Sequence, residues 1–389
     1  MQKTMTQSLS IAICMLVASS GCDESADFSW PSNTADAVTN YSQIVEASYL
    51  DSLTTAQSLN AALEALVMSP SEATLATART AWLQSREPYL QTEVYRFYDG
   101  PIDNPTDGPE GLLNAWPLDE QYIDYVDGMP NAGIINSSDN IDAMTLEGLN
   151  EIGGEKNIAT GYHAIEFLLW GQDSSDTGPG ARPHTDYVTG TAGTAANQDR
   201  RGVYLTTAGG LLLQHLGQVH GAWTPAGSYR SSFESDTQAA FEKILTGMIV
   251  LAGFETGGER LQAALDSGDQ EDEHSCFSDN THRDMILDVQ GISNVWNGSY
   301  TRTDGSVVSG IGIKDVVGVV DTALMMRVDS KISEALRLAN DLEVPFDQEI
   351  APMSAGNARV AALVTSLMEL ETVLTDVFSA FGLAVAIPE

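Results

Sequence analysis

The sequence predicts an all-α protein of two packed helical bundles, with about four long helices in each. Apolar residues recur at helical spacing through most of the chain, and strand patterns are nearly absent. A turn-rich segment at residues 224–232 separates the helical stretches into two halves. Paired four-helix bundles suit helices of this number and length. An apolar fraction of 43% is enough to build their cores.

The first 22 residues have the pattern of a lipoprotein-type signal peptide. Lys3 precedes an apolar run at residues 11–18, and small residues stand directly before Cys22. The run is too short to cross a bilayer comfortably, which favours a cleaved leader over a transmembrane helix. We expect lipidated Cys22 to anchor the protein on the periplasmic side of a bacterial cell envelope, followed by a flexible tether at residues 23–35.

The N-terminal helical bundle is predicted for residues 36–225. Its first helix covers residues 37–68, and the Ser-Pro-Ser-Glu sequence at 69–72 resembles a capping box that starts a second helix. We expect Pro88 to kink or break this second helix, with a continuation through Phe97. Further helices are predicted at 161–171 and 200–223, separated by a long loop at 172–198.

The C-terminal helical bundle is predicted for residues 230–389. The candidate for a β-hairpin lies at residues 300–308, around Asp304 and Gly305. The predicted helices are at 233–254, 280–296, 315–342 and 357–381.

The charge of the chain limits its partners. It has 18 basic and 54 acidic residues and a formal net charge of −36, so it repels nucleic acid and anionic membrane surfaces. We therefore expect no nucleic-acid partner and no membrane contact apart from the lipid anchor. The acidic residues are spread along the chain, which favours a solvated acidic surface. Cys276 is expected to be a buried free thiol.

The helix at 161–171 carries a histidine and a glutamate although it is apolar on all sides. His163 and Glu166 lie three residues apart and project from one face. Burying an imidazole and a carboxylate without partners costs several kcal/mol, so the two must be hydrogen-bonded, ion-paired or bound to a cation. A mixed nitrogen and oxygen donor set suits iron, zinc or manganese better than copper(I).

Two more polar side chains are predicted to face the core. Helical spacing places Glu93 between aromatic residues, where either a metal ion or an ion pair with Arg86 or Arg96 would compensate its charge. His282 shares a face with apolar residues, and it is either a ligand or an ordinary hydrogen-bonded core histidine.

The sequence from Gly161 to Glu166 resembles the GxHxxE signature of the imelysin-like family, and most closely its iron-regulated protein A branch. Residues 86–93, 98–103 and 273–284 also look like segments of that branch, so the resemblance covers the chain from about residue 36 onward. It implies an imelysin-like pair of bundles, with these motifs meeting near the interface between the two domains.

With this resemblance, the sequence predicts a cell-envelope protein that binds a divalent metal and takes part in iron acquisition. The metal would be iron, with zinc as the second candidate, and the partner an envelope iron-transport system. The expected ligands at the inter-domain site are His163, Glu166 and Glu93, with His282 as a ligand or a hydrogen-bonding neighbour. Other residues expected to line the site are Arg86, which would orient a carboxylate or an anionic ligand, Glu273 and Asp279.

Two alternatives stay open. One is an imelysin-type metallopeptidase that uses the same cluster, although the chain has neither an HExxH motif nor a G-x-S-x-G elbow. The other is a protein that binds a peptide or a haem-like ligand without a metal, in which His163 and Glu166 form a structural hydrogen-bond network.

Overall fold

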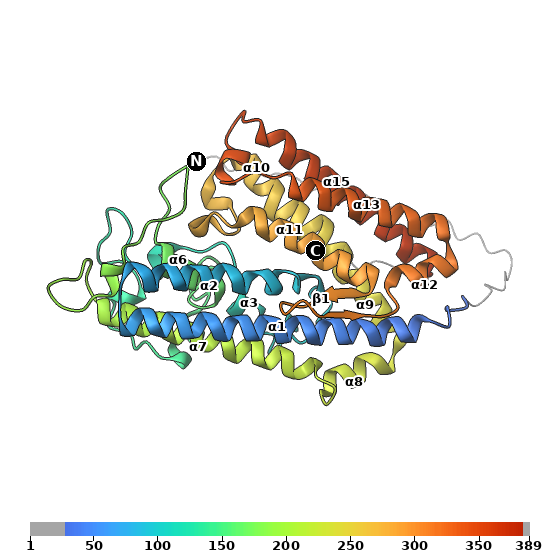
Figure 1. Cartoon of the computed structure of the whole chain (residues 1–389), viewed down its shortest axis with the longest axis horizontal. Helices are drawn as coiled ribbons and strands as arrows, with labels where there is room; N and C mark the ends of the chain where they lie inside the picture. The colour runs from blue at the N-terminus through green and yellow to red at the C-terminus, as the bar shows by residue number, and fades with distance from the viewer. Residues whose placement is uncertain (1–27, 384–389) are drawn as a thin grey trace, which may run out of the picture.

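The computed structural model describes residues 28–383 (Figure 1). The predicted signal peptide, Cys22 and residues 23–27 of the predicted tether lie outside the described residues. Helices and one two-stranded sheet make up the regular secondary structure of the described residues, so the all-α prediction is confirmed. No described helix is both long enough and apolar enough to cross a membrane.

Four helices form the first group. Helix α1 (Thr34–Met68) packs along both α2 (Glu72–Leu90) and α7 (Gln198–Trp223), and α6 (Gly161–Trp170) packs against α2 and α7. Figure 1 shows α1 and α7 side by side over most of their length. All ten residues of α6 are buried, as its apolar sequence predicted.

A second group of helices lies above the first in Figure 1. Helix α9 (Thr237–Val250) continues through a π-helical segment (Leu251–Gln262) into α10 (Ala263–Ser267). This continuous rod packs against α15 (Gly356–Ala380), which also packs against α13 (Thr322–Asn340). Helix α11 (Thr281–Asn297) contacts α13 within the group and α2 of the first group. The two groups therefore meet along α2 and α11.

Short elements connect these helices. Strands β1 (Ser299–Thr301) and β2 (Val307–Ser309) pair antiparallel, which confirms the predicted hairpin. The remaining elements are η1 (Glu93–Tyr95), α3 (Glu110–Leu113), α4 (Glu120–Ile123), η2 (Ile134–Asn136), α5 (Ala143–Leu149), η3 (His184–Tyr187), α8 (Ser228–Ser235), η5 (Gln270–Asp272), η6 (Cys276–Ser278), α12 (Ile313–Val320) and α14 (Asp347–Ile350).

The start of α2 differs from the prediction by two residues. Ser71 caps this helix and forms a capping box with Thr74: the Ser71 side chain accepts from the Thr74 amide, and the Thr74 hydroxyl accepts from the Ser71 amide. Ser69 instead ends α1. Thr74 thus fills the position that glutamate or glutamine usually takes in this motif.

The end of α2 also differs. The helix continues through Pro88 to Leu90, because a proline in the last turn removes only one backbone hydrogen bond before the helix ends. No helix runs on through Phe97. That residue has a φ of 71° and Asp99 one of 54°, and these left-handed conformations cannot extend a right-handed helix. Glu93 consequently lies in a short 3₁₀ turn, out of helical register with Tyr89.

Aspartate caps divide two stretches that were each predicted as one helix. Asp236 accepts a hydrogen bond from the amide of Ala239 and starts α9, and Asp321 accepts from the amide of Leu324 and starts α13. Such caps satisfy amides that have no partner in the first turn of a helix. Apolar spacing alone does not reveal these interruptions.

Candidate functional site

Two glycines fix the ends of α6 and so the positions of its polar side chains. Gly161 begins the helix with a φ of 84°, and a Cβ at this position would lie 2.5 Å from the carbonyl oxygen of Leu113. Gly171, with a φ of 73°, ends it. The first glycine of the GxHxxE pattern is therefore required by backbone conformation and by close packing.

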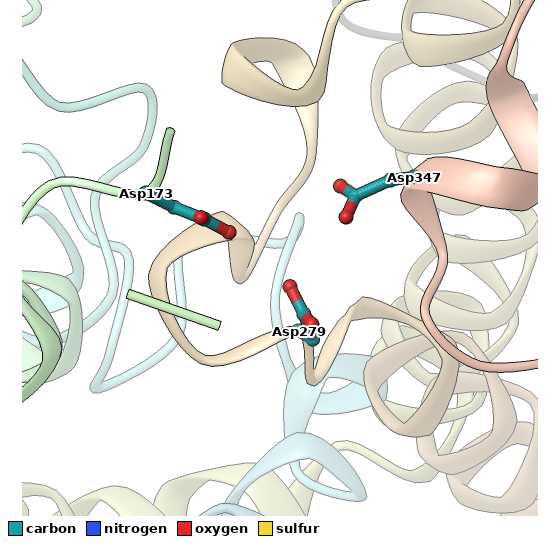
Figure 2. A group of neighbouring side chains, drawn as sticks. All are labelled: Asp173, Asp279 and Asp347. Carbon is teal, nitrogen blue, oxygen red and sulfur yellow. The ribbon is translucent and has the colours of Figure 1, made fainter. Parts of the chain in front are cut away.

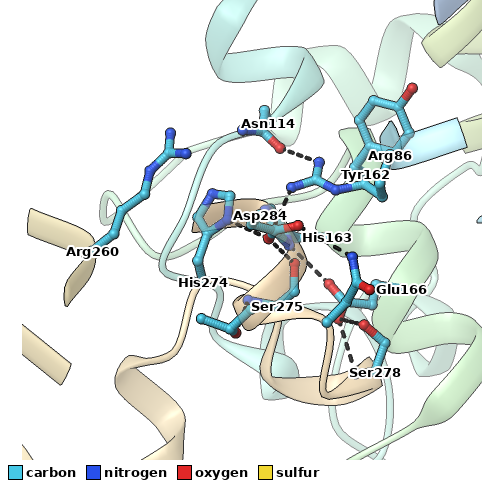
Figure 3. A network of polar contacts seen from close by, with 12 residues as sticks. Arg86, Asn114, Tyr162, His163, Glu166, Arg260, His274, Ser275, Ser278 and Asp284 are labelled. Carbon is cyan, nitrogen blue, oxygen red and sulfur yellow. Dashed lines mark hydrogen bonds and ion pairs between the residues drawn. The ribbon is translucent and has the colours of Figure 1, made fainter. Parts of the chain in front are cut away.

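His163 and Glu166 contact each other and a loop of the second helical group. Nδ1 of His163 lies 2.9 Å from Oε2 of Glu166 (Figure 3). The other oxygen, Oε1, accepts hydrogen bonds from the amide and the hydroxyl of Ser278, at 3.0 and 2.6 Å. Both oxygens of Glu166 are thus engaged within the protein, which favours an orienting role for Glu166 over direct metal ligation.

A second histidine faces His163. The ring centroids of His163 and His274 are 4.8 Å apart, with the rings nearly perpendicular. Nδ1 of His274 lies 2.7 Å from Oδ2 of Asp284, and this carboxylate also accepts hydrogen bonds from Ser275 and Asn280. The site therefore contains two imidazoles, each held through Nδ1 by a carboxylate.

The Nε2 atoms are the free ends of these imidazoles. Nε2 of His163 is buried and has no hydrogen-bond partner among residues 28–383. His274 lines a pocket of about 420 Å³ together with Trp116 and Arg260. Burial lowers the pKa of both histidines well below the usual value, and the positive charges of Arg86 and Arg260 lower it further. Both rings are therefore neutral, the form that binds metals.

Arg86 orients one of these carboxylates. Its guanidinium group is completely buried, donates to the side-chain oxygen of Asn114 and lies 3.4 Å from Oδ2 of Asp284. The ring of Tyr162 packs against it, with the centroid 4.9 Å from Cζ. Arg86 thereby supports the Asp284 carboxylate that holds His274.

Glu93 takes part in an ion-pair network. Its Oε2 accepts hydrogen bonds from Arg96 and Arg260, and Arg260 also donates to Asp288 at 2.9 Å. Burial by itself would raise the pKa of Glu93, but the two arginines outweigh burial and lower the pKa to about 2. The pair with Arg96 is the alternative that the sequence left open. Oε1 of Glu93 accepts no hydrogen bond in the described chain.

The other residues expected at the site lie elsewhere. His282 is partly buried on α11, and no hydrogen bond within residues 28–383 joins it to His163 or His274. Glu273 and Asp279 come from the loop that carries His274. Asp279 lies in a separate group of carboxylates with Asp173 and Asp347 (Figure 2), and Glu273 lies next to Asp347. In place of His282, the structure brings His274 to His163.

Sequence reasoning singled out the loop of His274 but not its pairing with His163. The two histidines are 111 positions apart in the sequence, and Ser278 reaches Glu166 over a separation of 112. No local periodicity encodes such contacts. The available signal was the density of polar side chains at residues 273–284, a segment that runs from the loop into the first turn of α11.

Fold and site together define a class: an all-α protein with a pair of carboxylate-oriented histidines where its two helical groups meet. The chain belongs to the imelysin family, whose family model matches residues 45–374. The family-level expectation from the sequence is thereby confirmed.

One protein of similar sequence and one solved structure of similar fold carry the name iron-regulated protein A. The protein of that name from Synechococcus elongatus is 26% identical over 274 residues, which is 68% of this chain and 63% of that protein. The chain therefore spans less than two thirds of the length of this relative. A crystal structure described as an iron-regulated protein A precursor, from Parabacteroides distasonis, has a TM-score of 0.71 at 18% identity and covers 93% of this chain and 98% of that one.

Proposed function

We propose that this protein binds a divalent metal ion, iron first and zinc second, and takes part in iron acquisition at the bacterial cell envelope. The observation that carries the proposal is the pair of buried, neutral imidazoles, each oriented by a carboxylate at Nδ1. Metal-binding histidines commonly have this arrangement, in which a carboxylate fixes the ring and the other nitrogen faces the ion.

The proposed ligands are Nε2 of His163 and Nε2 of His274. Glu166 and Asp284 would orient the two rings, and Oε1 of Glu93 is a further oxygen donor within the same polar network. Imidazole with carboxylate suits iron and zinc. Carboxylates also surround the adjacent pocket and would attract cations to it; they belong to Glu110, Glu151, Glu155, Glu255 and Glu259.

The link to iron and to the envelope rests on different support. The proposal of iron is supported by the name iron-regulated protein A, which the Synechococcus elongatus protein and the similar crystal structure carry. The proposal of the cell envelope is supported by the lipoprotein-type leader pattern before Cys22. We propose that the lipid anchor holds the protein on the periplasmic side, where an envelope iron-transport system would exchange metal with it.

Elemental analysis of protein exposed to iron(II) without oxygen, or to zinc, tests the site. The variants His163→Ala and His274→Ala should lose the single bound metal ion and keep the far-ultraviolet circular dichroism of the wild type. His184→Ala is the matched control, because His184 pairs with Glu72 at the surface. Full metal content in the double variant H163A/H274A would refute the proposed ligands.

The same preparations separate the alternatives. The metallopeptidase would be established if the protein cleaves an unfolded protein substrate, if a chelator abolishes this cleavage and added metal restores it, and if the variant H163A does not cleave. The alternative of a peptide- or haem-binding protein would be favoured if the metal-free protein binds haem or a peptide tightly, and if substitutions in the pocket beside His274 weaken this binding.

A further inference from the structure

A second group of acidic side chains lies apart from the two histidines. One carboxylate oxygen from each of Asp173, Asp279 and Asp347 lies within 4.8 Å of the other two. Figure 2 shows these side chains converging from three segments: the loop after α6, the turn before α11 and the start of α14.

Glu273 adds a fourth carboxylate. It is completely buried, and neither of its oxygens accepts a hydrogen bond from a donor within residues 28–383. It lies next to Asp347. Asp347 is only 5% exposed, and both its oxygens also lack a donor in the described chain. Glu273 and Asp347 thus present buried, unpartnered oxygens to the group.

Counted together, six carboxylate oxygens lack a hydrogen-bond donor among the described residues. They are Oδ2 of Asp173, Oε1 and Oε2 of Glu273, Oδ1 of Asp279, and Oδ1 and Oδ2 of Asp347. Within the described chain, no arginine, lysine or histidine forms an ion pair with any of the four residues. Buried carboxylates elsewhere differ: Asp124 pairs with Arg182 and Arg201.

The uncompensated charge affects protonation. Burial, together with the neighbouring carboxylates, raises the pKa of Asp173 to about 6 and that of Asp279 to about 7. Buried carboxylates that lack a positive partner are costly for the fold. A bound cation would remove this cost.

We propose that Asp173, Glu273, Asp279 and Asp347 bind a hard divalent cation of the calcium type. The donor set is oxygen only, as Ca²⁺ prefers, and one oxygen from each of three of these residues lies within 4.8 Å of the other two. Water molecules would complete the coordination, as they commonly do at Ca²⁺ sites. Neither imidazole nor thiolate takes part, which separates this site from the two histidines and their preference for iron or zinc.

The cation would also join distant parts of the chain. Asp173 follows α6 of the first helical group, whereas Asp347 begins α14, which packs against α15 of the second group. The same region contains a direct hydrogen bond from the Gln270 side chain to the backbone oxygen of Asp173, at 2.7 Å. Cation binding is therefore expected to stabilise the folded state.

Titration calorimetry with CaCl₂ on chelator-treated protein tests this site, in about 0.15 M NaCl to screen diffuse attraction by the acidic surface. The wild type should bind in a saturable manner to a single site. The double variant Asp173→Asn/Asp347→Asn should bind at least tenfold more weakly. Asp199→Asn is the matched control, because Asp199 is an exposed acid in the first turn of α7. Unchanged binding in the double variant, or no saturable binding in the wild type, would overturn the proposal.

Thermal unfolding checks that the double variant is folded. The asparagine substitutions remove charge repulsion, so the metal-free double variant should melt at or above the temperature of the metal-free wild type. Ca²⁺ should raise the melting temperature of the wild type and leave that of the double variant unchanged. An equal Ca²⁺ shift in both proteins would also overturn the proposal. The variant H163A/H274A should retain Ca²⁺ binding, which separates this test from that of the proposed function.

Discussion

Single buried carboxylates in this protein differ widely in protonation. Glu166 and Glu93 are both completely buried, yet burial raises the pKa of Glu166 to about 8, whereas Arg96 and Arg260 lower the pKa of Glu93 to about 2 against the effect of burial. Glu93 is therefore charged at neutral pH. Glu166 holds a proton that metal binding can displace.

Metal binding at His163 is expected to depend on pH. While Glu166 is a carboxylic acid, it donates to Nδ1 of the neutral His163 ring, so Nε2 carries the hydrogen of that ring. Losing one proton leaves Nδ1–H facing the carboxylate and frees Nε2. Affinity should therefore rise from about pH 6 to about pH 8 and then level off, with proton release below that point. Calorimetry in buffers of different ionisation enthalpy measures the release of protons. An affinity independent of pH would contradict a proton on Glu166 that binding displaces.

Gly161 is expected to tolerate no side chain. The variant Gly161→Ala places a Cβ against the Leu113 carbonyl at a positive φ, so it should lower the free energy of unfolding by more than about 1 kcal/mol. Gly210→Ala is the control, because Gly210 is exposed in α7 and its Cβ would meet open space. There, alanine should stabilise by about 0.5–1 kcal/mol. Urea denaturation measures both, and equal effects would contradict this account.

Among the elements, the π-helical segment Leu251–Gln262 places polar groups in the interior. Thr256 and Arg260 both point from it toward Asp288 on α11, at 3.0 and 2.9 Å, and Arg260 reaches on to Glu93. π-Helical turns occur often at functional sites. Here the segment brings the second helical group to the ion pairs beside the histidines.

Removing Arg260 should cost much more than removing a surface arginine. Arg260→Leu leaves Asp288 and Glu93 with fewer partners in the interior, and the expected loss in the free energy of unfolding is about 3–5 kcal/mol. Arg283→Leu breaks a pair with Glu87 that is partly exposed, so its expected cost is under about 1 kcal/mol. Chemical denaturation of the two variants under identical conditions makes the comparison, and similar losses would contradict it.

How well the sequence predicted an element depended on where its determinants lie. Helix α6 and the hairpin around Asp304 were predictable, because apolar spacing and turn residues are local. The turn that holds Glu93 was not, since the left-handed backbone at Phe97 forms against Asp103, whose carboxylate accepts from the amides of residues 97, 98 and 100. The approach of His274 to His163 depends on the packing of the two helical groups and has no local signature.

For the molecule as a whole, charge is the dominant property. A net charge of −36 makes the folded state repel itself, most strongly where ions are scarce. The division into two helical groups adds a line of contact along α2 and α11 that this repulsion opposes. Screening by salt should therefore favour the folded state.

The melting temperature is expected to rise with salt. Between about 0.02 and 0.5 M NaCl the screening length falls several-fold, which weakens repulsion among surface acids. Differential scanning calorimetry in NaCl and in choline chloride measures the effect. The two salts should act alike at equal ionic strength, and a rise with sodium alone would point to specific binding of Na⁺ in place of screening.

The loop before α11 has a consequence that reaches beyond either site. Glu273 and Asp279 face the carboxylate group, while His274 and Ser278, their immediate neighbours, face His163 and Glu166. Residues 273–279 form part of both sites, so an ion bound at one site would restrict the residues that form part of the other site. Linkage then requires reciprocity: if calcium strengthens the binding of iron, iron strengthens the binding of calcium by the same factor. If both proposed ions bind and are coupled in this way, the calcium concentration would change how readily the protein releases iron.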